Sequence, residues 1–180
     1  MTTILVTGAT DGIGFETARQ LATGGARVLV HGRTEAKAKE SVKRLAGAGQ
    51  VEAVWADLSS LAQVRSLAAQ VKGLTSTLDV LLNNAGVFAN EELRTEDGFE
   101  LTLGVNHLAH VLLTHELLPL VEEARGRVVN VSSIAHGSGR IEEADLPVLR
   151  HFEGYRAYAA SKLLNVYFTH ELARRLAAKK

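Results

Sequence analysis

Short runs of apolar, often β-branched residues alternate with longer stretches of helical periodicity along the whole chain. The short runs predict strands over 4–7, 27–31, 51–55, 78–84 and 127–133. The longer stretches predict helices over 12–23, 34–46, 59–72 and 98–121, and a last one from about 155 to 178. Strands apolar on both faces that alternate with helices are typical of a parallel sheet between two helical layers. We therefore predict a doubly wound α/β fold with about five strands, in a single domain over residues 1–180.

Composition narrows the function classes. Twenty basic and twenty acidic side chains balance, so no net field favours nucleic acid or anionic lipid as a partner. Cysteine is absent, which excludes disulfides and thiolate chemistry. No window reaches the ~18 uninterrupted apolar residues of a membrane span. Seven histidines are scattered without a partner set of carboxylates, so we expect no metal site. These features predict a soluble, cytoplasmic protein.

The sequence TGATDGIG, residues 7–14, lies between the first predicted strand and the first helix. At this place a parallel sheet presents its carboxyl edge to ligands. Gly8 allows a tight turn, Gly12 leaves room for a pyrophosphate, and Gly14 lets helix pack closely on strand. The spacing differs from the G-x-G-x-x-G fingerprint, so only the roles of the three glycines support a dinucleotide site, and not the fingerprint itself. The alternative is a plain glycine-rich turn.

The end of the second predicted strand bears on cofactor selectivity. NAD sites usually carry an acidic residue there, but here the sequence reads HGRTEAK, with Gly32 in that place and Arg33 after it. A guanidinium binds a 2′-phosphate well, and no carboxylate repels it. We therefore expect NADP(H), with NAD(H) the less favoured cofactor. The alternative is a solvated arginine before a helix that Thr34 caps.

Tyr158 and Lys162 stand four positions apart in YAASK, so on a helix they share one face. A fixed cation beside a phenol favours the phenolate and suits it to proton exchange. Ser133 ends the fifth predicted strand at the same sheet edge, where its hydroxyl is suited to hold a carbonyl oxygen. Asn106 is an amide in an otherwise apolar helix and needs buried partners. Taken singly, each has an ordinary structural explanation, such as a tyrosine packed on a lysine stem.

Five motifs together resemble the short-chain dehydrogenase/reductase family: TGATDGIG at 7–14, NNAG at 83–86, Asn106, VNVSS at 129–133 and YAASK at 158–162. The stretches 97–118 and 161–176 further resemble the branch of retinol dehydrogenases and protochlorophyllide reductase. The resemblance implies a Rossmann-like fold and a catalytic set of Asn106, Ser133, Tyr158 and Lys162. Tyr158 would exchange the proton, Lys162 would hold the nicotinamide ribose, Ser133 would orient the substrate oxygen and Asn106 would reach Lys162 through a water.

The resemblance also implies the residues that bind the cofactor. Asp57 would bind the adenine edge, with a helix cap as the competing interpretation. The implied set is Gly8, Thr10, Asp11, Gly12, Ile13, Gly14, Arg33, Asp57, Leu58, Asn84, Ala85, Gly86, Tyr158 and Lys162.

Members of the family continue past the tyrosine–lysine helix with two more strands and a substrate-covering lobe, which we expect to be missing here. A truncated chain, a partial gene model and a swapped oligomer are all left open. The implied function is an NADP(H)-dependent oxidoreductase for an apolar carbonyl or alcohol, in a homo-oligomer such as a dimer paired through 98–121 and 155–178. The alternative is a truncated or remnant nucleotide-binding protein that keeps the cofactor site without turnover.

Overall fold

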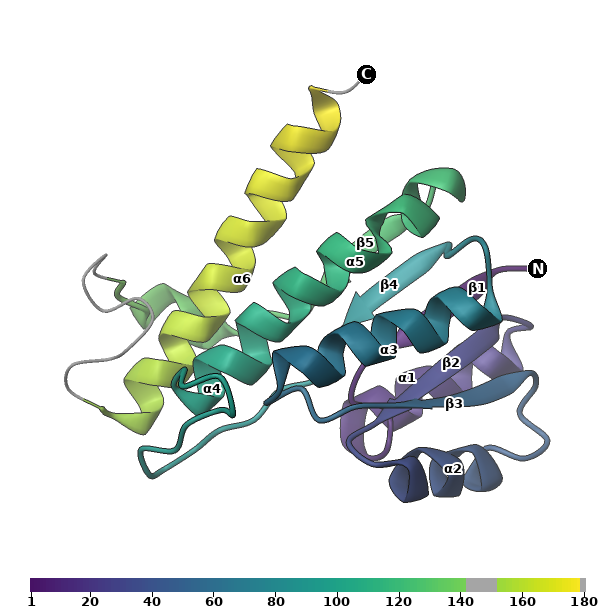
Figure 1. Cartoon of the computed structure of the whole chain (residues 1–180), viewed down its shortest axis with the longest axis horizontal. Helices are drawn as coiled ribbons and strands as arrows, with labels where there is room; N and C mark the ends of the chain where they lie inside the picture. Colours follow the sequence, from purple (N-terminus) through teal and green to yellow (C-terminus); the bar gives the residue numbers. More distant parts are fainter. Residues whose placement is uncertain (142–151, 179–180) are drawn as a thin grey trace.

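A computed structural model describes residues 1–141 and 152–178, and these form a five-stranded parallel sheet flanked by helices (Figure 1). The strand order is β3-β2-β1-β4-β5, and every pairing is parallel. The first strand, β1, lies at the centre of the sheet, and the following strands are added first on one side and then on the other. The predicted doubly wound fold is therefore confirmed. The strands are β1 Thr3–Val6, β2 Arg27–Gly32, β3 Val51–Trp55, β4 Val80–Asn83 and β5 Arg127–Asn130.

The helices cover both faces of the sheet. In Figure 1, α3, α5 and α6 lie in front of the sheet and α1 lies behind it. Their bounds are α1 Gly12–Thr23, α2 Glu35–Arg44, α3 Leu61–Leu74, the short α4 Leu101–Leu103, α5 Ala109–Glu123 and α6 Gly154–Ala177. A π-helical segment, η1 Gly104–Leu108, joins α4 to α5, and a 3₁₀ turn, η2 Ile134–Ser138, follows β5.

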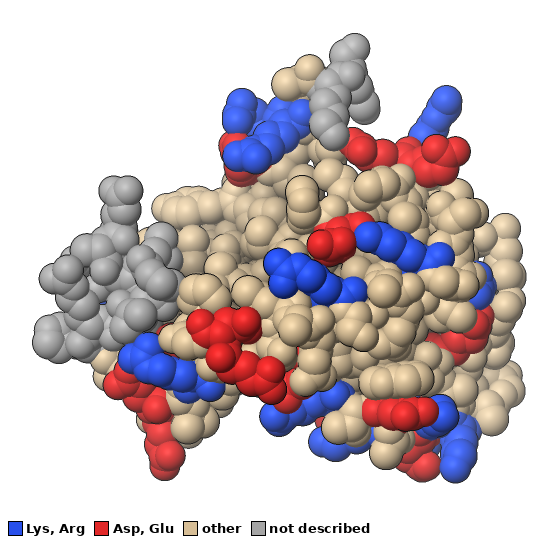
Figure 2. All heavy atoms as spheres, in the orientation of Figure 1, with Lys and Arg blue, Asp and Glu red and all other residues tan. Residues whose placement is uncertain are grey.

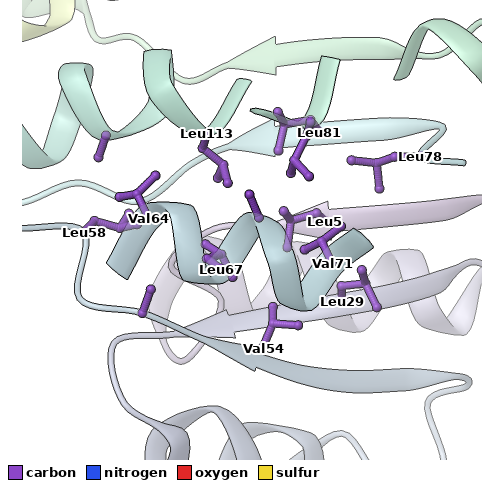
Figure 3. Close-up of a cluster of buried hydrophobic side chains, with 14 of the residues drawn as sticks. Leu5, Leu29, Val54, Leu58, Val64, Leu67, Val71, Leu78, Leu81 and Leu113 are labelled. Carbon is purple, nitrogen blue, oxygen red and sulfur yellow. The ribbon is translucent and has the colours of Figure 1, made fainter. Parts of the chain in front are cut away.

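The alternation of side chains along the strands divides the core in two. Leu5 belongs to a cluster with residues of α3 and α5, such as Leu67 and Leu113 (Figure 3). Its neighbour Val6 points to the opposite face, in a cluster with residues of α1 such as Ala18. All five of these side chains are fully buried, which fixes the sheet register and both helical layers.

Two predicted elements differ from the structure. The helix predicted over 98–121 begins at Leu101 and is interrupted by η1, where the Ala109 amide donates to the Gly104 carbonyl five residues earlier. The strand predicted over 127–133 ends at Asn130. The Val131 amide still donates to the Asn83 carbonyl of β4, and the next residue, Ser132, donates its hydroxyl to the Lys162 carbonyl of α6 at 2.8 Å, so the chain there turns from the sheet to the helix. The long loop predicted over 135–153 starts with η2, and its residues 142–151 lie outside the described part.

Charged side chains of both signs are interspersed on the face shown in Figure 2. This agrees with the balanced charge of the sequence. Across residues 1–141 and 152–178, no helix combines the length and the hydropathy that crossing a membrane requires. Within the same residues, no group of three or more histidine, aspartate or glutamate side chains is placed to hold a metal ion.

Candidate active site

The glycine turn between β1 and α1 is shaped for an anion. Gly8 and Gly12 have φ of +64° and +51°, a region that favours glycine. A Cβ on Gly12 would meet no atom within 4 Å, so the space above this residue is open. The N-cap residue Asp11 makes no side-chain bond to the amides of α1. The first amides of a 12-residue helix therefore face an open cradle, which fits the pyrophosphate of a dinucleotide.

Thr7 fastens this turn to the segment after β4. Its Oγ1 accepts hydrogen bonds from the amides of Asn84, at 2.8 Å, and Ala85, at 2.9 Å. The Asn84 side chain donates in return to the carbonyls of Thr7 and Gly8. A Cβ on Gly8 would lie 2.8 Å from Ala85 Cα, so only glycine permits this approach. The predicted cofactor residues of the two turns are thus held side by side.

His31, the fifth residue of β2, supports the same turn from below. Its Nδ1 accepts from the Gly8 amide at 3.0 Å, and its Nε2 donates to the Ala56 carbonyl at 3.1 Å. Both partners have fixed roles, so the ring is the neutral Nε2–H tautomer. Burial lowers the pKa of His31 to about 4. A neutral histidine therefore joins the turn after β1 to the end of β3.

Arg33 and Asp57 form an ion pair across the ends of β2 and β3. Arg33 Nε lies 2.7 Å from Asp57 Oδ2, and the arginine side chain is 70% exposed. Burial of Asp57 opposes its ionisation, but hydrogen bonds from Ser59 and Arg33 outweigh it and hold the pKa of the carboxyl below its usual value. Asp57 Oδ1 also accepts from the Ser59 amide and hydroxyl, which closes a turn before α3. The N-cap of α3 is Ser60, so the competing interpretation of Asp57 as the helix cap is wrong.

The side chains of Tyr158 and Lys162 lie on one face of α6, as predicted. Lys162 Nζ is 5.6 Å from the centre of the Tyr158 ring, and the Phe88 ring packs against the same ring at 5.5 Å. The lysine is 4% exposed, and burial lowers its pKa. Its ammonium donates to the Val131 carbonyl at 3.2 Å. Among the described residues, no hydrogen bond involves the Tyr158 hydroxyl, which leaves it available to a ligand.

Asn106 lies in η1 and fixes the segment after β4. Its Oδ1 accepts from the Val87 amide at 2.7 Å, and its Nδ2 donates to the Val87 carbonyl and to Ser161 Oγ. A Cβ on Gly86 would lie 3.4 Å from Asn106 Oδ1 and 3.6 Å from Lys162 Nζ. Asn106, Gly86 and Lys162 therefore meet at one point of the sheet edge.

Ser133 was predicted to end the fifth strand, but it lies three residues beyond β5 as the N-cap of η2. Its Oγ accepts from the Ala135 amide at 3.2 Å. Within the described part of the chain the Ser133 hydroxyl proton has no acceptor, so it is free to bind an oxygen of a ligand. The neighbouring Ser132 donates its hydroxyl to the Lys162 carbonyl of α6 instead.

The remaining predicted residues lie at the same edge in different environments. Ile13 follows the open glycine and is 80% exposed. The Thr10 carbonyl accepts from Arg44 at 2.9 Å. Leu58 is buried in the hydrophobic core, so its side chain faces away from the edge.

Sequence reasoning missed the buried polar residues that connect these groups. They are Thr7, His31, His110 and Asn165. His110 Nδ1 donates to the Asn106 carbonyl at 3.1 Å, which leaves Nε2 to accept from the Thr7 hydroxyl at 3.0 Å. The available signal was a polar residue inside an apolar strand or helix, such as the histidine that closes RVLVH.

Comparison with known proteins gives consistent matches over nearly the whole chain. The family model of the short chain dehydrogenases matches residues 2–180. Retinol dehydrogenase 11 of Homo sapiens is 45% identical over 177 residues, which cover 96% of this chain and 56% of the relative. Retinol dehydrogenase 13 of Homo sapiens is 42% identical over 179 residues, or 97% of this chain and 54% of the relative. The chain thus spans little more than half the length of these relatives.

Solved structures agree with these matches. A crystal structure of a putative uncharacterized protein from Mycobacterium Paratuberculosis superposes with a TM-score of 0.89 at 43% identity, covering 99% of this chain and 64% of that one. The Pseudomonas aeruginosa RhlG/NADP active-site complex gives a TM-score of 0.80 at 31% identity, covering 98% of this chain and 68% of that one. The resemblance read from five short motifs is therefore confirmed, and the chain belongs to the short-chain dehydrogenase family.

Proposed function

We propose that this chain carries the cofactor site and the proton-transfer residues of an NADP(H)-dependent oxidoreductase that interconverts a carbonyl and an alcohol. The observation that carries the proposal is the pairing of Tyr158 with Lys162, 5.6 Å from ammonium to ring centre, at the sheet edge where the glycine turn opens. A bound nicotinamide supplies or accepts the hydride. Tyr158 exchanges the proton of the substrate oxygen, with the Lys162 ammonium on the same face of α6.

The described residues fit a dinucleotide along the whole edge. Gly12 and the first amides of α1 would hold the pyrophosphate. Ala85 and Gly86 would present their backbone to the ribose of the adenosine half, and Asp57 would bind the adenine. Lys162 would hold the ribose of the nicotinamide half. The residues of this set lie between the ends of β2 and β3 and the face of α6.

Selectivity for NADP rests on Arg33 and Gly32. Asp57 binds only the Nε of Arg33, so the two terminal nitrogens of the guanidinium have no acceptor within residues 1–141 and 152–178. They are suited to a bidentate contact with a 2′-phosphate. Gly32 carries no carboxylate to repel it. RhlG, a relative of similar fold, was solved as an NADP complex.

The substrate is an apolar aldehyde, ketone or alcohol. Phe88 is 48% exposed although its ring packs on Tyr158, and Ile134, which follows Ser133, is 92% exposed. These apolar side chains flank the phenol and the serine hydroxyl that bind the substrate oxygen. The names of the curated relatives refer to retinol, an apolar alcohol, so retinal belongs in the first panel of substrates.

The first test measures cofactor binding and turnover on one preparation. Fluorescence titration with NADPH and NADH is followed by assays with retinal and smaller aldehydes and ketones. We expect tighter binding of NADPH, and we expect Tyr158→Phe to reduce turnover by about 100-fold or more while changing NADPH affinity less than about threefold, because general acid–base catalysis contributes on that scale.

Three results would contradict parts of the proposal. If neither cofactor binds, the function fails. If NADH binds more tightly, only the role of Arg33 fails. If NADPH binds and no substrate turns over, the protein is a nucleotide-binding protein without effective catalysis.

A further inference from the structure

Asn165 lies on α6, one turn after Lys162, and is 4% exposed. Its amide makes three hydrogen bonds, two to residues of η1 and one to the chain just after β5. Nδ2 donates to the Asn106 carbonyl in η1 at 3.1 Å and to the Val131 carbonyl just after β5 at 3.3 Å. Oδ1 lies 3.0 Å from His107 Nδ1.

The partners determine the orientation of this amide. Both carbonyls are acceptors, so they require the NH₂ group, and each of its two protons has one partner. The oxygen then faces His107, whose Nδ1 donates to it. An apolar or acidic side chain at this position cannot reproduce the set, because neither has a donor for the two buried carbonyls.

The three elements joined at Asn165 are those that carry the proposed catalytic residues. Helix α6 carries Tyr158 and Lys162, η1 carries Asn106, and the chain after β5 leads to Ser133. Val131 also accepts from Lys162 Nζ at 3.2 Å, so the lysine and Asn165 share one acceptor. Loss of the Asn165 bond leaves that carbonyl to Lys162 alone and frees α6 to shift relative to η1.

We infer that Asn165 is a positioning residue that sets the place of Lys162 for the nicotinamide half of the cofactor. The inference rests on the proposed function, because it assigns Lys162 to the ribose of that half. It adds a residue that touches neither cofactor nor substrate and acts through the lysine and through Asn106. His107 takes part by holding the amide in the required orientation.

The test compares two ligands that differ in the half of the cofactor they contain. NADPH reaches Lys162, whereas 2′,5′-ADP occupies only the adenosine half near Arg33 and Asp57. For Asn165→Leu we expect the Kd of NADPH to rise about tenfold, on the scale of one or two hydrogen bonds, and the Kd of 2′,5′-ADP to stay within twofold. His107→Phe keeps Asn165 and an aromatic ring at position 107. It should raise the Kd of NADPH about threefold and leave the Kd of 2′,5′-ADP unchanged within twofold.

Thr169→Val is the matched control. Thr169 lies one turn beyond Asn165 on α6, and its hydroxyl accepts from Asn130 at the end of β5 at 2.9 Å. The substitution removes this link between α6 and β5, together with the bond from the same hydroxyl to the Asn165 main-chain carbonyl. It leaves the side-chain amide of Asn165 with its bonds to Val131, Asn106 and His107. We expect the ratio of the two Kd values to remain that of the unmodified protein. An Asn165→Leu protein that binds both ligands unchanged, or both weakened alike, overturns the inference.

A cofactor-free measurement separates this inference from the proposed function. In hydrogen exchange of the free protein, Asn165→Leu should speed exchange in peptides covering η1 and residues 127–133, whereas Thr169→Val should affect only the latter. Unchanged exchange in η1 overturns the link through Asn165 whether or not cofactor binds. Failure of the unmodified protein to bind both NADPH and 2′,5′-ADP overturns the proposed function instead.

Discussion

His31 and His110 are buried rings that serve the candidate site without touching a ligand. Burial lowers the pKa of each to about 4, and for His110 the nearby Lys162 adds to the effect. Both rings are neutral because each uses one nitrogen as an acceptor, from the Gly8 amide and from the Thr7 hydroxyl respectively. Protonation would replace these acceptors with donors and break the contacts that hold the glycine turn.

Acid should therefore destabilise the fold before the carboxylates titrate. The folded pKa lies below the unfolded value of 6.5, so the unfolded chain binds more protons between the two values and stability falls as pH falls through this window. We expect a loss of roughly 2 kcal/mol for each ring by pH 5. Urea unfolding at pH 8 and pH 5 measures it.

Substitutions assign this loss to the two rings. His31→Gln keeps an acceptor and a donor on one side chain and should make stability less dependent on pH. His115→Ala, at an exposed position of α5, is the control and should leave the dependence unchanged. An equal pH dependence in His31→Gln and the unmodified protein would show that other groups are responsible.

Two features favour glycine at position 32: close packing, and the absence of a carboxylate that would repel a 2′-phosphate. A Cβ at this position would lie 2.8 Å from the Ala38 amide nitrogen of α2 and 2.8 Å from the Thr10 methyl. Gly32→Ala should therefore lower the free energy of unfolding by about 1–3 kcal/mol, since backbone must shift. Gly73→Ala on α3, where a Cβ meets nothing within 4 Å, should be neutral or stabilising by up to about 1 kcal/mol.

Thermal or urea unfolding of the two variants decides the point. Equal stability of Gly32→Ala and Gly73→Ala would show that α2 yields easily to a side chain at the end of β2. In that case packing would not explain why glycine stands at this position.

At the scale of the element, the sequence pattern predicted those helix bounds and caps that depend on neighbouring residues in the chain. The first helix was placed at 12–23 and is found there, and Thr34 caps α2 by accepting from the Lys37 amide. The π-helical η1 was missed because apolar spacing does not distinguish one extra residue in a turn from a regular helix. The fifth strand was predicted too long because the β-branched Val131 continues the apolar pattern beyond Asn130, where β5 ends.

In the candidate site, too, residues with a local sequence signature were predicted and residues without one were missed. Glycines, Tyr158 and Lys162 have signatures within a few residues, and the structure brings them to one edge. Asn165 has no such signature, since its three partners lie 34 to 59 positions away in sequence. Such a residue is found only when the fold shows which buried carbonyls need a donor.

At the scale of the whole molecule, β5 is an edge strand of the described sheet. It pairs with β4 on one side, and on its other side no strand of residues 1–141 and 152–178 pairs with it. Arg127 is exposed and Val129 is 40% exposed. An open edge with apolar exposure favours pairing with another copy of the chain.

We therefore expect the 180-residue chain to self-associate through β5 as its concentration rises. Val129→Lys should shift the sedimentation-average mass back toward the monomer, because a charge on an edge strand opposes pairing. Tyr167→Lys, at a 56% exposed position of α6, separates this surface from pairing through the helices α5 and α6. If Tyr167→Lys alone restores the monomer, association occurs through the helices, and the edge of β5 is protected by its short length instead.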